Sequence, residues 1–458
     1  MHTHTRLALA LACAIGTAPV FAADDLQQLK LEIEQIRQTY ESRLSDLEAR
    51  LNLAEARVET AKTTAESAQN AVQSGSTQPS PAPAAATNAF NPAISLVLSG
   101  IYSNLSQDPA NYRMTGFIPG GEIGPGQRGF SLAESELGIS ANVDPWFYGA
   151  INFSIHPDDT VSSEEAFLQT TALPNGVRVK FGRFFSGIGY LNEQHAHTWD
   201  FVDAPLAYQA FLGGQMGDDG VQVKWLLPTE QFVELGAELG RGRNFPGSDR
   251  DKNGAGSGTL FVHAGGDVSD SHSWRAGLSW LTTDPRDRQF GATDPSNNTV
   301  TNSFTGKSRL WLADFVWKWA PHGNGERTNF KIQGEYFHRT ESGDLTYDLA
   351  TANNTDAYRS AQSGWYLQGV YQFMPAWRVG LRYDRLDSGS VNLAGNAANL
   401  ANPDYRPSKY SLMADWTPSE FSRIRLQFAQ DKSRQGVTDN QMSLQYQMSL
   451  GAHGAHIF

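Results

Sequence analysis

Beyond Pro92 the chain places a hydrophobic residue at every second position, and this alternation limits its fold more than any other feature. In the segment 442–450, Met, Leu and Tyr alternate with Ser and Gln. The same pattern, with charged residues on the second face, recurs in 177–181, 311–319, 377–384 and 423–428. A period of two predicts strands that have one apolar and one polar face.

The spacing of these segments predicts a closed barrel. About sixteen of them run from near Ile94 to Phe458. Tight turns are expected near 143–146, 173–176, 227–230, 374–376 and 417–420, and longer polar loops at 284–306, 341–358 and 387–407. Short turns at one end and long loops at the other are typical of transmembrane barrels, whereas an open two-sheet sandwich has no reason to separate them. We therefore expect an all-β transmembrane barrel of about sixteen antiparallel strands.

The mean hydropathy of −0.42 fits this reading, because lipid-facing and lumen-facing residues average out along a barrel strand. Large aromatic residues near the strand ends are expected at the two membrane interfaces. An even number of strands would put both chain ends at the short-turn, periplasmic side. The net charge of −12 leaves no basic surface for nucleic acid.

The first residues indicate export. Arg6 precedes an apolar run at 7–15, and Val20-Phe21-Ala22 provides small residues for cleavage, so residues 1–22 are predicted to be a signal peptide. The apolar run is too short to span a bilayer. The only cysteine, Cys13, lies inside this segment, so the mature chain would have no disulfide.

Residues 23–74 are predicted to form a coiled-coil stalk. Their apolar positions recur at alternating spacings of three and four, with Glu, Gln, Arg, Lys and Thr between them. Ile33 and Ile36 occupy both seam positions, which favours more than two strands, so we expect a homotrimer. A single helix packed on a globular domain is the alternative. Residues 75–92, rich in Pro, Ala and Ser, are the predicted linker to the barrel at 93–458.

Two groups of residues could contact a solute or a metal. The alternation turns a set of basic residues toward the lumen, where they would suit carboxylate or phosphate groups or would pair with lumenal acids. These predicted pore residues are Arg178, Lys180, Arg378, Arg382, Arg423 and Arg425. His195 and His197, with Asp200 nearby, form the only metal-like cluster, and they could hold a divalent ion. No spacing indicates a catalytic triad, so we expect no enzyme and no cofactor.

The layout of stalk, Pro-rich spacer, barrel and terminal Phe458 resembles the sixteen-stranded trimeric porins of Gram-negative bacteria, among them phosphate-selective, dicarboxylate and sugar types with an N-terminal coiled coil. His456, third from the end, departs from the usual apolar or aromatic residue. The resemblance implies one long loop folded into the lumen, and 186–219 is the best match. Its acids Glu193, Asp200 and Asp203 would then face lumenal bases and set up a transverse field.

The expected function is passive diffusion of small hydrophilic solutes or ions across the outer membrane, in contact with its lipid and with the stalk in the periplasm. Two alternatives stay open. The barrel could be a divalent-metal-associated uptake channel, or it could be a structural protein that anchors the stalk.

Overall fold

The computed structural model describes residues 92–118, 120–121, 123–400 and 404–451. The chain divides into two compact units, Met1–Thr87 and Asn88–Phe458, and every described residue belongs to the second. The predicted signal peptide, coiled-coil stalk, nearly all of the linker and Phe458 lie outside the described residues and stay predictions.

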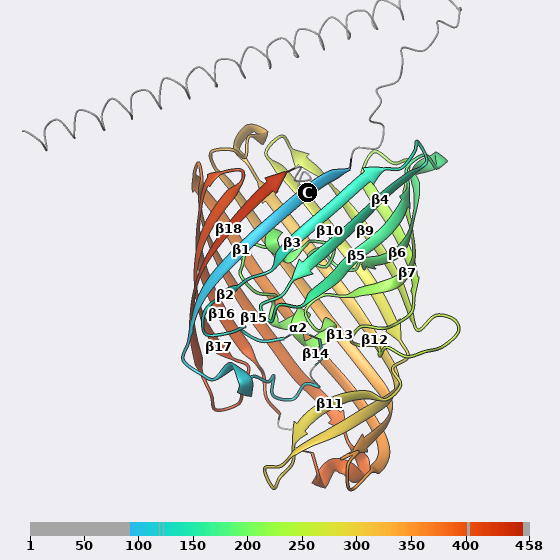
Figure 1. Cartoon of the computed structure of the whole chain (residues 1–458). Coiled ribbons are helices and arrows are strands. Elements are labelled where there is room, and N and C mark those ends of the chain that lie inside the picture. Colours follow the sequence, from blue (N-terminus) through green and yellow to red (C-terminus); the bar gives the residue numbers. More distant parts are fainter. Residues whose placement is uncertain (1–91, 119, 122, 401–403, 452–458) are drawn as a thin grey trace, which may run out of the picture. The chain divides into compact units, whose positions relative to one another are not determined.

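The described residues form one closed antiparallel barrel (Figure 1). Its first strand pairs with its last over Ser95–Leu105 and with β2 and β3 on the other side. The sheet contains 18 strand segments. Segments β2 and β3 both pair with β1, and β10 and β11 both pair with β12, so each couple is one interrupted strand. The barrel therefore has sixteen strands, which confirms the predicted fold.

The strand bounds follow the alternating segments of the sequence. The first half comprises β1 (Ala93–Leu105), β2 (Gly129–Leu132), β3 (Ser135–Asn142), β4 (Phe147–Ile155), β5 (Val161–Thr170), β6 (Val177–Phe185), β7 (Gly217–Leu226), β8 (Phe232–Gly240) and β9 (Ser257–Ser269). The second half comprises β10 (His272–Thr283), β11 (Arg288–Thr293), β12 (Thr299–Trp319), β13 (Asn329–Tyr347), β14 (Asn354–Met374), β15 (Trp377–Asn392), β16 (Ser408–Ser419), β17 (Ser422–Lys432) and β18 (Asp439–Gly451).

Connection length separates the two ends of the barrel only in part. The tight turns lie at the end where β1 begins, as at Ser269/His272 and Met374/Trp377. At the opposite end, two of the predicted long loops are wrong. Residues 284–306 and 341–358 are mostly strand, because β11 to β14 continue as paired hairpins beyond the rest of the barrel (Figure 1).

These extensions have a small core of their own. It contains Phe290, Phe304, Leu345, Tyr358 and, from the 387–407 loop, Leu393. Polar residues dominate the rest of these hairpins, so their sequence resembles that of a loop. A short helical turn, η5 (Ala394–Ala398), lies in the 387–407 loop.

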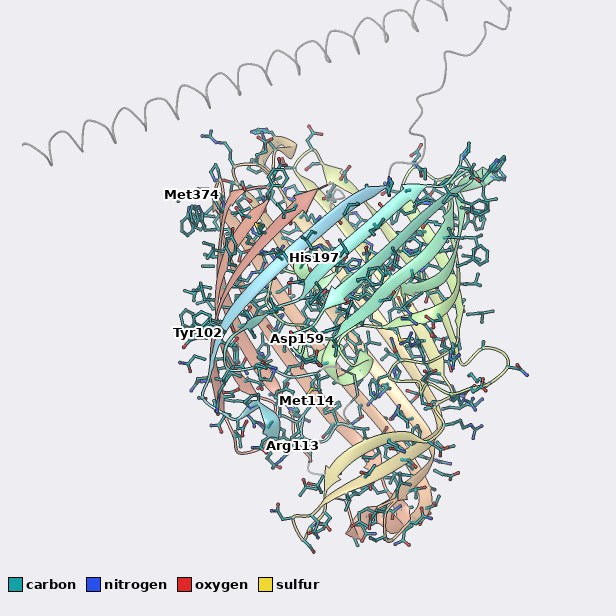
Figure 2. All side chains as sticks on the ribbon, viewed as in Figure 1. Tyr102, Arg113, Met114, Asp159, His197 and Met374 are labelled. Atoms are coloured by element: carbon teal, nitrogen blue, oxygen red, sulfur yellow. The ribbon has the colours of Figure 1, made fainter. Side chains whose placement is uncertain are left out.

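The outward face of the barrel is apolar. Half or more of the side chain is exposed at Leu381, Leu412 and Trp311, and nearly half at Phe315 and Phe428. Figure 2 shows such side chains projecting from the flanks of the barrel. Exposed aromatic residues gather next to the tight turns, and they include Trp146, Phe147, Trp225, Phe232, Phe373, Trp377, Trp416 and Phe421. An apolar band edged by aromatic residues is the surface that a barrel presents to lipid.

In the part of the chain that the structure describes, helical structure is confined to the connections between strands. Helix α2 (Leu206–Leu212) follows the turn η3 (Ala196–Thr198), and both lie between β6 and β7. Among the described residues no helix is long and apolar enough to cross a bilayer.

Candidate functional site in the barrel lumen

Residues 186–216, the connection between β6 and β7, contact lumen-facing side chains of the barrel wall, and we call them the β6–β7 segment. Its two acids in the middle pair with bases of the wall. Asp200 lies 2.5 Å from the Lys331 ammonium of β13 and 3.2 Å from the Arg378 guanidinium of β15. Asp203 lies 3.0 Å from Arg382 on β15 and 2.9 Å from Lys409 on β16.

Two further arginines hold the backbone of the same segment. Arg425 on β17 donates to the Trp199 carbonyl at 2.8 Å, and it is oriented by Asp415 at 2.8 Å. Arg423 donates to the His197 carbonyl at 2.7 Å and to Gln447 at 2.6 Å. Arg378 and Arg382 of β15 and Arg423 and Arg425 of β17, which we call the arginine ladder, thus lie on two strands separated by β16. Their charges largely hold the chain's own carboxylates and carbonyls.

Glu335 on β13 is a second anchor. Its carboxylate accepts the backbone N–H groups of Tyr190 and Leu191, each at 3.2 Å, and the hydroxyl of Tyr208 at 2.9 Å. Gly189 precedes these donors with φ of 67°, and a Cβ there would lie 2.3 Å from the Glu335 carboxylate. Only glycine allows this conformation at so close an approach.

Helix α2 packs on an apolar part of the inner wall. All seven of its residues are buried, and the Leu206 N–H donates to Asp384 at 2.9 Å. The Phe211 ring stacks on Phe337 of β13 with centroids 5.8 Å apart. The wall contributes lumen-facing leucines, namely Leu281, Leu310, Leu312 and Leu386. Apolar residues on the polar face of these strands were the sequence signal for this docking surface.

On the opposite side of the segment, two histidines meet a group of glutamates. His195 Nδ1 lies 3.1 Å from Glu136 on β3 and 3.2 Å from Glu164 on β5, and its Nε2 lies 3.0 Å from Glu165. His197 Nδ1 lies 3.0 Å from the same Glu136 oxygen. We call Glu136, Glu164, Glu165, His195 and His197 the His–Glu cluster.

Glu164 joins this cluster because β5 contains a bulge. Its neighbours pair regularly, Glu165 with Asn152 and Ser163 with Phe153, so Glu164 is the extra residue. A bulge turns two consecutive side chains to the same face. Strict alternation would point Glu164 away from the lumen, so the sequence pattern missed it.

The predicted metal set needs correction. His195 and His197 lie together, with ring centroids 5.7 Å apart, but Asp200 does not join them. Its carboxylate is held by Lys331 and Arg378. The carboxylates beside the two histidines are instead those of Glu136 on β3 and of Glu164 and Glu165 on β5.

The remaining predicted pore residues lie elsewhere. Glu193 pairs with Lys224 on β7 at 2.6 Å. The Lys180 ammonium lies 4.3 Å above the Phe167 ring. Arg178 is exposed beside the tight turn that precedes β6, where it pairs in register with Lys224 of β7. Lys409, which pairs with Asp203, was missed although it lies on the same face of β16 as Asp415.

Charge pairing fixes the ionisation of the segment's acids. Burial opposes the charged form of Glu193, but Lys224 and Lys180 outweigh it and lower its pKa to about 2. Burial likewise opposes ionisation of Asp203, whereas Arg382 and Lys409 lower its pKa. Both groups are therefore negative at neutral pH.

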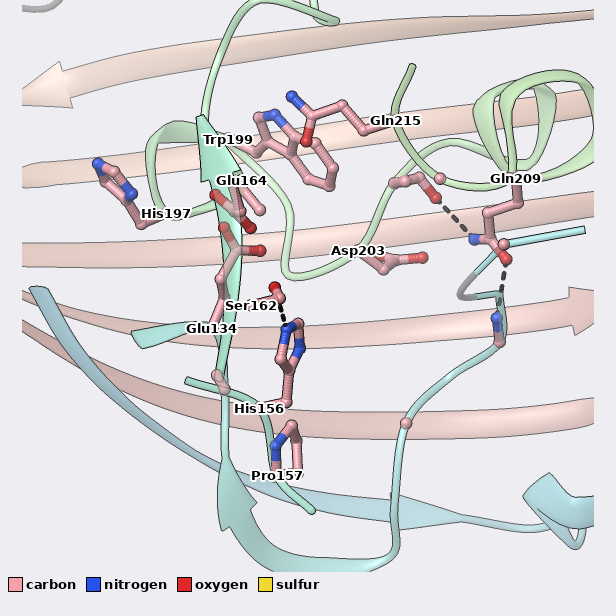
Figure 3. Close-up of a pocket in the computed structure, with 18 of the residues that line it drawn as sticks. Glu134, His156, Pro157, Ser162, Glu164, His197, Trp199, Asp203, Gln209 and Gln215 are labelled. Carbon is pink, nitrogen blue, oxygen red and sulfur yellow. Dashed lines mark hydrogen bonds between the residues drawn. The ribbon is translucent and has the colours of Figure 1, made fainter. Parts of the chain in front are cut away.

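Two cavities lie on either side of the β6–β7 segment. One, of about 640 Å³, opens toward the long connections and is lined by Glu134, Glu164 and Asp203 (Figure 3). The other, of about 900 Å³, reaches the tight turns and is lined by Glu136, Lys331 and Arg378 among others. His197 lines both cavities.

A stripe of uncharged residues on β1 and β18 lines both cavities. Ser443 and Gln445 line the first cavity, and Gln447 and Ser449 line the second. The neighbouring strand β1 also lines both cavities, with Ile101 and Ser103 in the first and Ser95 and Val97 in the second. Both cavities are thus lined by His197 and by mostly small and amide side chains of β1 and β18.

Comparison with known proteins bears on both the family and the fold. No family model matches the chain. A protein of Aquifex aeolicus (strain VF5), described as an uncharacterized protein, is 31% identical over 401 residues, which cover 81% of this chain and 80% of that protein. The two proteins belong to one family.

Solved structures share the fold at much lower identity. A loop L8 deletion mutant of OmpT, an outer membrane protein of Vibrio cholerae, is 11% identical and has a TM-score of 0.50, covering 79% of this chain and 99% of that one. The outer membrane channel DcaP of Acinetobacter baumannii is 13% identical with a TM-score of 0.46, covering 79% and 97%. The OmpT likeness shows a common barrel fold.

Proposed function

We propose that this protein is an outer-membrane porin that lets small hydrophilic solutes or ions diffuse through its lumen. The observation that carries the proposal is a pair of lumenal cavities, both lined by His197, inside a barrel with an apolar outer face. An apolar outer band is stable in lipid, and a lumen lined by charged residues is typical of a water-filled channel, whereas a barrel interior that served only as a packed core would be apolar. The proposal contains no enzymatic step and no cofactor.

The β6–β7 segment narrows the lumen in this proposal. Its acids and backbone carbonyls are bound by wall bases, and α2 is buried against wall leucines. The passage left open lies between the His–Glu cluster on β3 and β5, Arg423 on β17, and the Ser and Gln stripe of β1 and β18. Opposite charges on two sides of this passage would orient polar solutes.

The lining favours cations. Acidic side chains outnumber lysines and arginines along both cavities, and the arginine ladder is occupied by Asp200, Asp203 and Asp415. We expect a modest preference for cations over anions. A homotrimer is part of the proposal and is supported by the heptad seam of residues 23–74.

Channel recordings test the proposal. The purified full chain, reconstituted in a planar bilayer with a potassium chloride gradient, should give stepwise conductance and a reversal potential on the cation side. An anchoring protein without an open pore would give no steps, and that result would overturn the proposal. A strong anion preference would instead overturn the charge argument while leaving the pore intact.

A further inference from the structure

Glu136 is buried, and one of its carboxylate oxygens lacks a hydrogen-bond donor among the described residues. Its side chain is 7% exposed, and its Oε2 atom accepts no hydrogen bond from the described residues. The same oxygen nevertheless lies 3.1 Å from His195 Nδ1 and 3.0 Å from His197 Nδ1. Two imidazole nitrogens thus approach one carboxylate oxygen without the directional geometry of hydrogen bonds.

Protonated histidines alone cannot satisfy all the carboxylates of this cluster. His195 Nδ1 carries at most one proton, yet it faces both Glu136 and Glu164 at 3.1 and 3.2 Å. Four glutamates gather here, since Glu134 lines the adjoining cavity beside Glu164 (Figure 3). Two imidazolium ions would still leave the group negative, and unpaired buried charge is costly.

A single divalent ion would satisfy the inner atoms together. One ligand atom each from Glu136, Glu164 and His195 lies within 4.8 Å of the other two. Bonds of about 2.0–2.1 Å to zinc put the atoms of a tetrahedral site roughly 3.3 Å apart. The separations of 3.0 to 3.2 Å from His195 and His197 to these carboxylates approach that value.

Glu165 supplies the outer partner that such a site requires. It lies 3.0 Å from His195 Nε2, the nitrogen that points away from Glu136. A histidine ligand generally donates its second N–H to a carboxylate, which fixes the ring and leaves the first nitrogen free for the metal. The bulge in β5 therefore provides one glutamate for the ion and one for the histidine.

We infer that Glu136, Glu164, His195 and His197 form a binding site for a divalent transition-metal ion in the lumen, where His197 lines both cavities, with Glu165 as a positioning residue. Mixed imidazole and carboxylate ligands suit zinc and its neighbours, whereas calcium and magnesium prefer oxygen ligands alone. The site needs the barrel but no ion flow, so it does not depend on the proposed function.

Calorimetric titration of zinc chloride into the detergent-solubilised full chain tests the site. One zinc ion should bind per chain, and calcium in large excess should not displace it. Glu136→Gln and His195→Asn should abolish measurable binding. Glu165→Gln should weaken it by about 10- to 100-fold, as outer partners of metal ligands do.

Controls separate this site from other histidines. His156→Asn changes a residue of the first cavity that bonds Ser162 at 2.7 Å, and it should leave binding unchanged. A double variant at His453 and His456 should do the same. Heat-modifiable migration on a gel verifies that each variant is folded.

Three results would overturn the inference. These are no saturable zinc binding, equal affinity in the wild type and in folded Glu136→Gln, or equal competition by calcium. Conductance of the same samples is recorded separately. A barrel that conducts without binding zinc refutes only the metal site, and one that binds zinc without conducting refutes only the porin.

Discussion

Single residues decide the sign of charge along the lumen. These bases of the wall lie beside acids: Arg382 and Lys409 share Asp203, and Lys331 pairs with Asp200. Asp384 and Asp431 add further negative charge beside Arg382 and Lys409. Among the described residues, the ion pairs of the glutamates of β3 and β5 are with two histidines. The matched side is therefore nearly neutral, and the unmatched side dominates the local field.

Asp203→Asn tests this balance. The substitution keeps the shape but removes one negative charge from beside Arg382 and Lys409, which retain only Asp384 and Asp431 among the described ion pairs. One charge about 4 Å away is worth about 1 kcal/mol in water, so the permeability ratio of potassium to chloride should fall roughly two- to fivefold. The reversal potential in a salt gradient measures it. Asp387→Asn, which removes an exposed pair with Arg406, should leave the ratio unchanged. An unchanged ratio in both variants would contradict the charge balance.

The direction of side chains was predictable from sequence only where strands are regular. Arg378, Arg382 and Arg425 follow the alternation and do face the lumen. Their partners were not predictable, because Asp200 and Asp203 come from an irregular segment far away in sequence. Glu164 was missed for a different reason, since one extra residue in β5 reverses the alternation.

At the scale of elements, the β6–β7 segment is docked by apolar packing as well as by charge. Phe211 is fully buried between Phe337 and Phe117. Truncating a buried phenylalanine costs about 3–5 kcal/mol. Phe211→Ala should therefore loosen α2, raising the single-channel conductance and the open-channel noise. The matched variant Phe315→Ala removes an outward ring that is 48% exposed, and its channel should behave as the wild type does. Equal recordings for the two variants would argue against a packed constriction.

Acid should release the same segment only at low pH. Burial opposes the charge on Asp200, but Lys331 and Arg378 lower its pKa, and Asp203 behaves alike. A folded-state pKa below the ordinary 3.9 gives stabilisation that is complete above that value and is lost as the pH falls through the folded-state pKa. The docked state should thus persist from neutral pH to about pH 4.

A buried cysteine reports this release. In Ala207→Cys the thiol would be fully buried on α2, and the only native cysteine is Cys13. Labelling with dithiodipyridine should be slow at pH 5 and at least about tenfold faster below pH 3, because protonation of the aspartates then favours the released segment over the docked one. Ala352→Cys, at an exposed position, should react readily throughout. Rapid labelling of Ala207→Cys at neutral pH would show that the segment is not docked.

At the scale of the whole molecule, the barrel was predictable because one simple physical requirement acts on nearly every residue. A strand between lipid and water must alternate, and a closed sheet must return to its first strand, as β18 does to β1. The extended hairpins of β11 to β14 were not predictable, because there both faces meet water or a small local core and the alternation fades. The docked α2 was also hidden, since a helix of seven residues has too little pattern to recognise.

Membrane embedding itself can be tested on the outer face. Leu381 is 58% exposed and lies on β15 between Trp377 and Tyr383, opposite Leu412 of β16. An arginine at the bilayer midplane costs about 2–4 kcal/mol, so Leu381→Arg should lower the stability of the barrel refolded into lipid vesicles by that amount. Urea titration followed by tryptophan fluorescence measures it.

The matched variant lies on the same outward face but beyond the aromatic band. Ala357 is exposed on the extension of β14, where it pairs with Asp344 of β13. Ala357→Arg should cost nothing, because water surrounds this hairpin whether or not the barrel is in lipid. In detergent micelles both variants should be equally stable, because a micelle can deform so that the new arginine side chain stays in contact with water. A Leu381→Arg barrel as stable in lipid as Ala357→Arg would mean that the apolar band does not face a bilayer, and the pore proposal would then lose its physical basis.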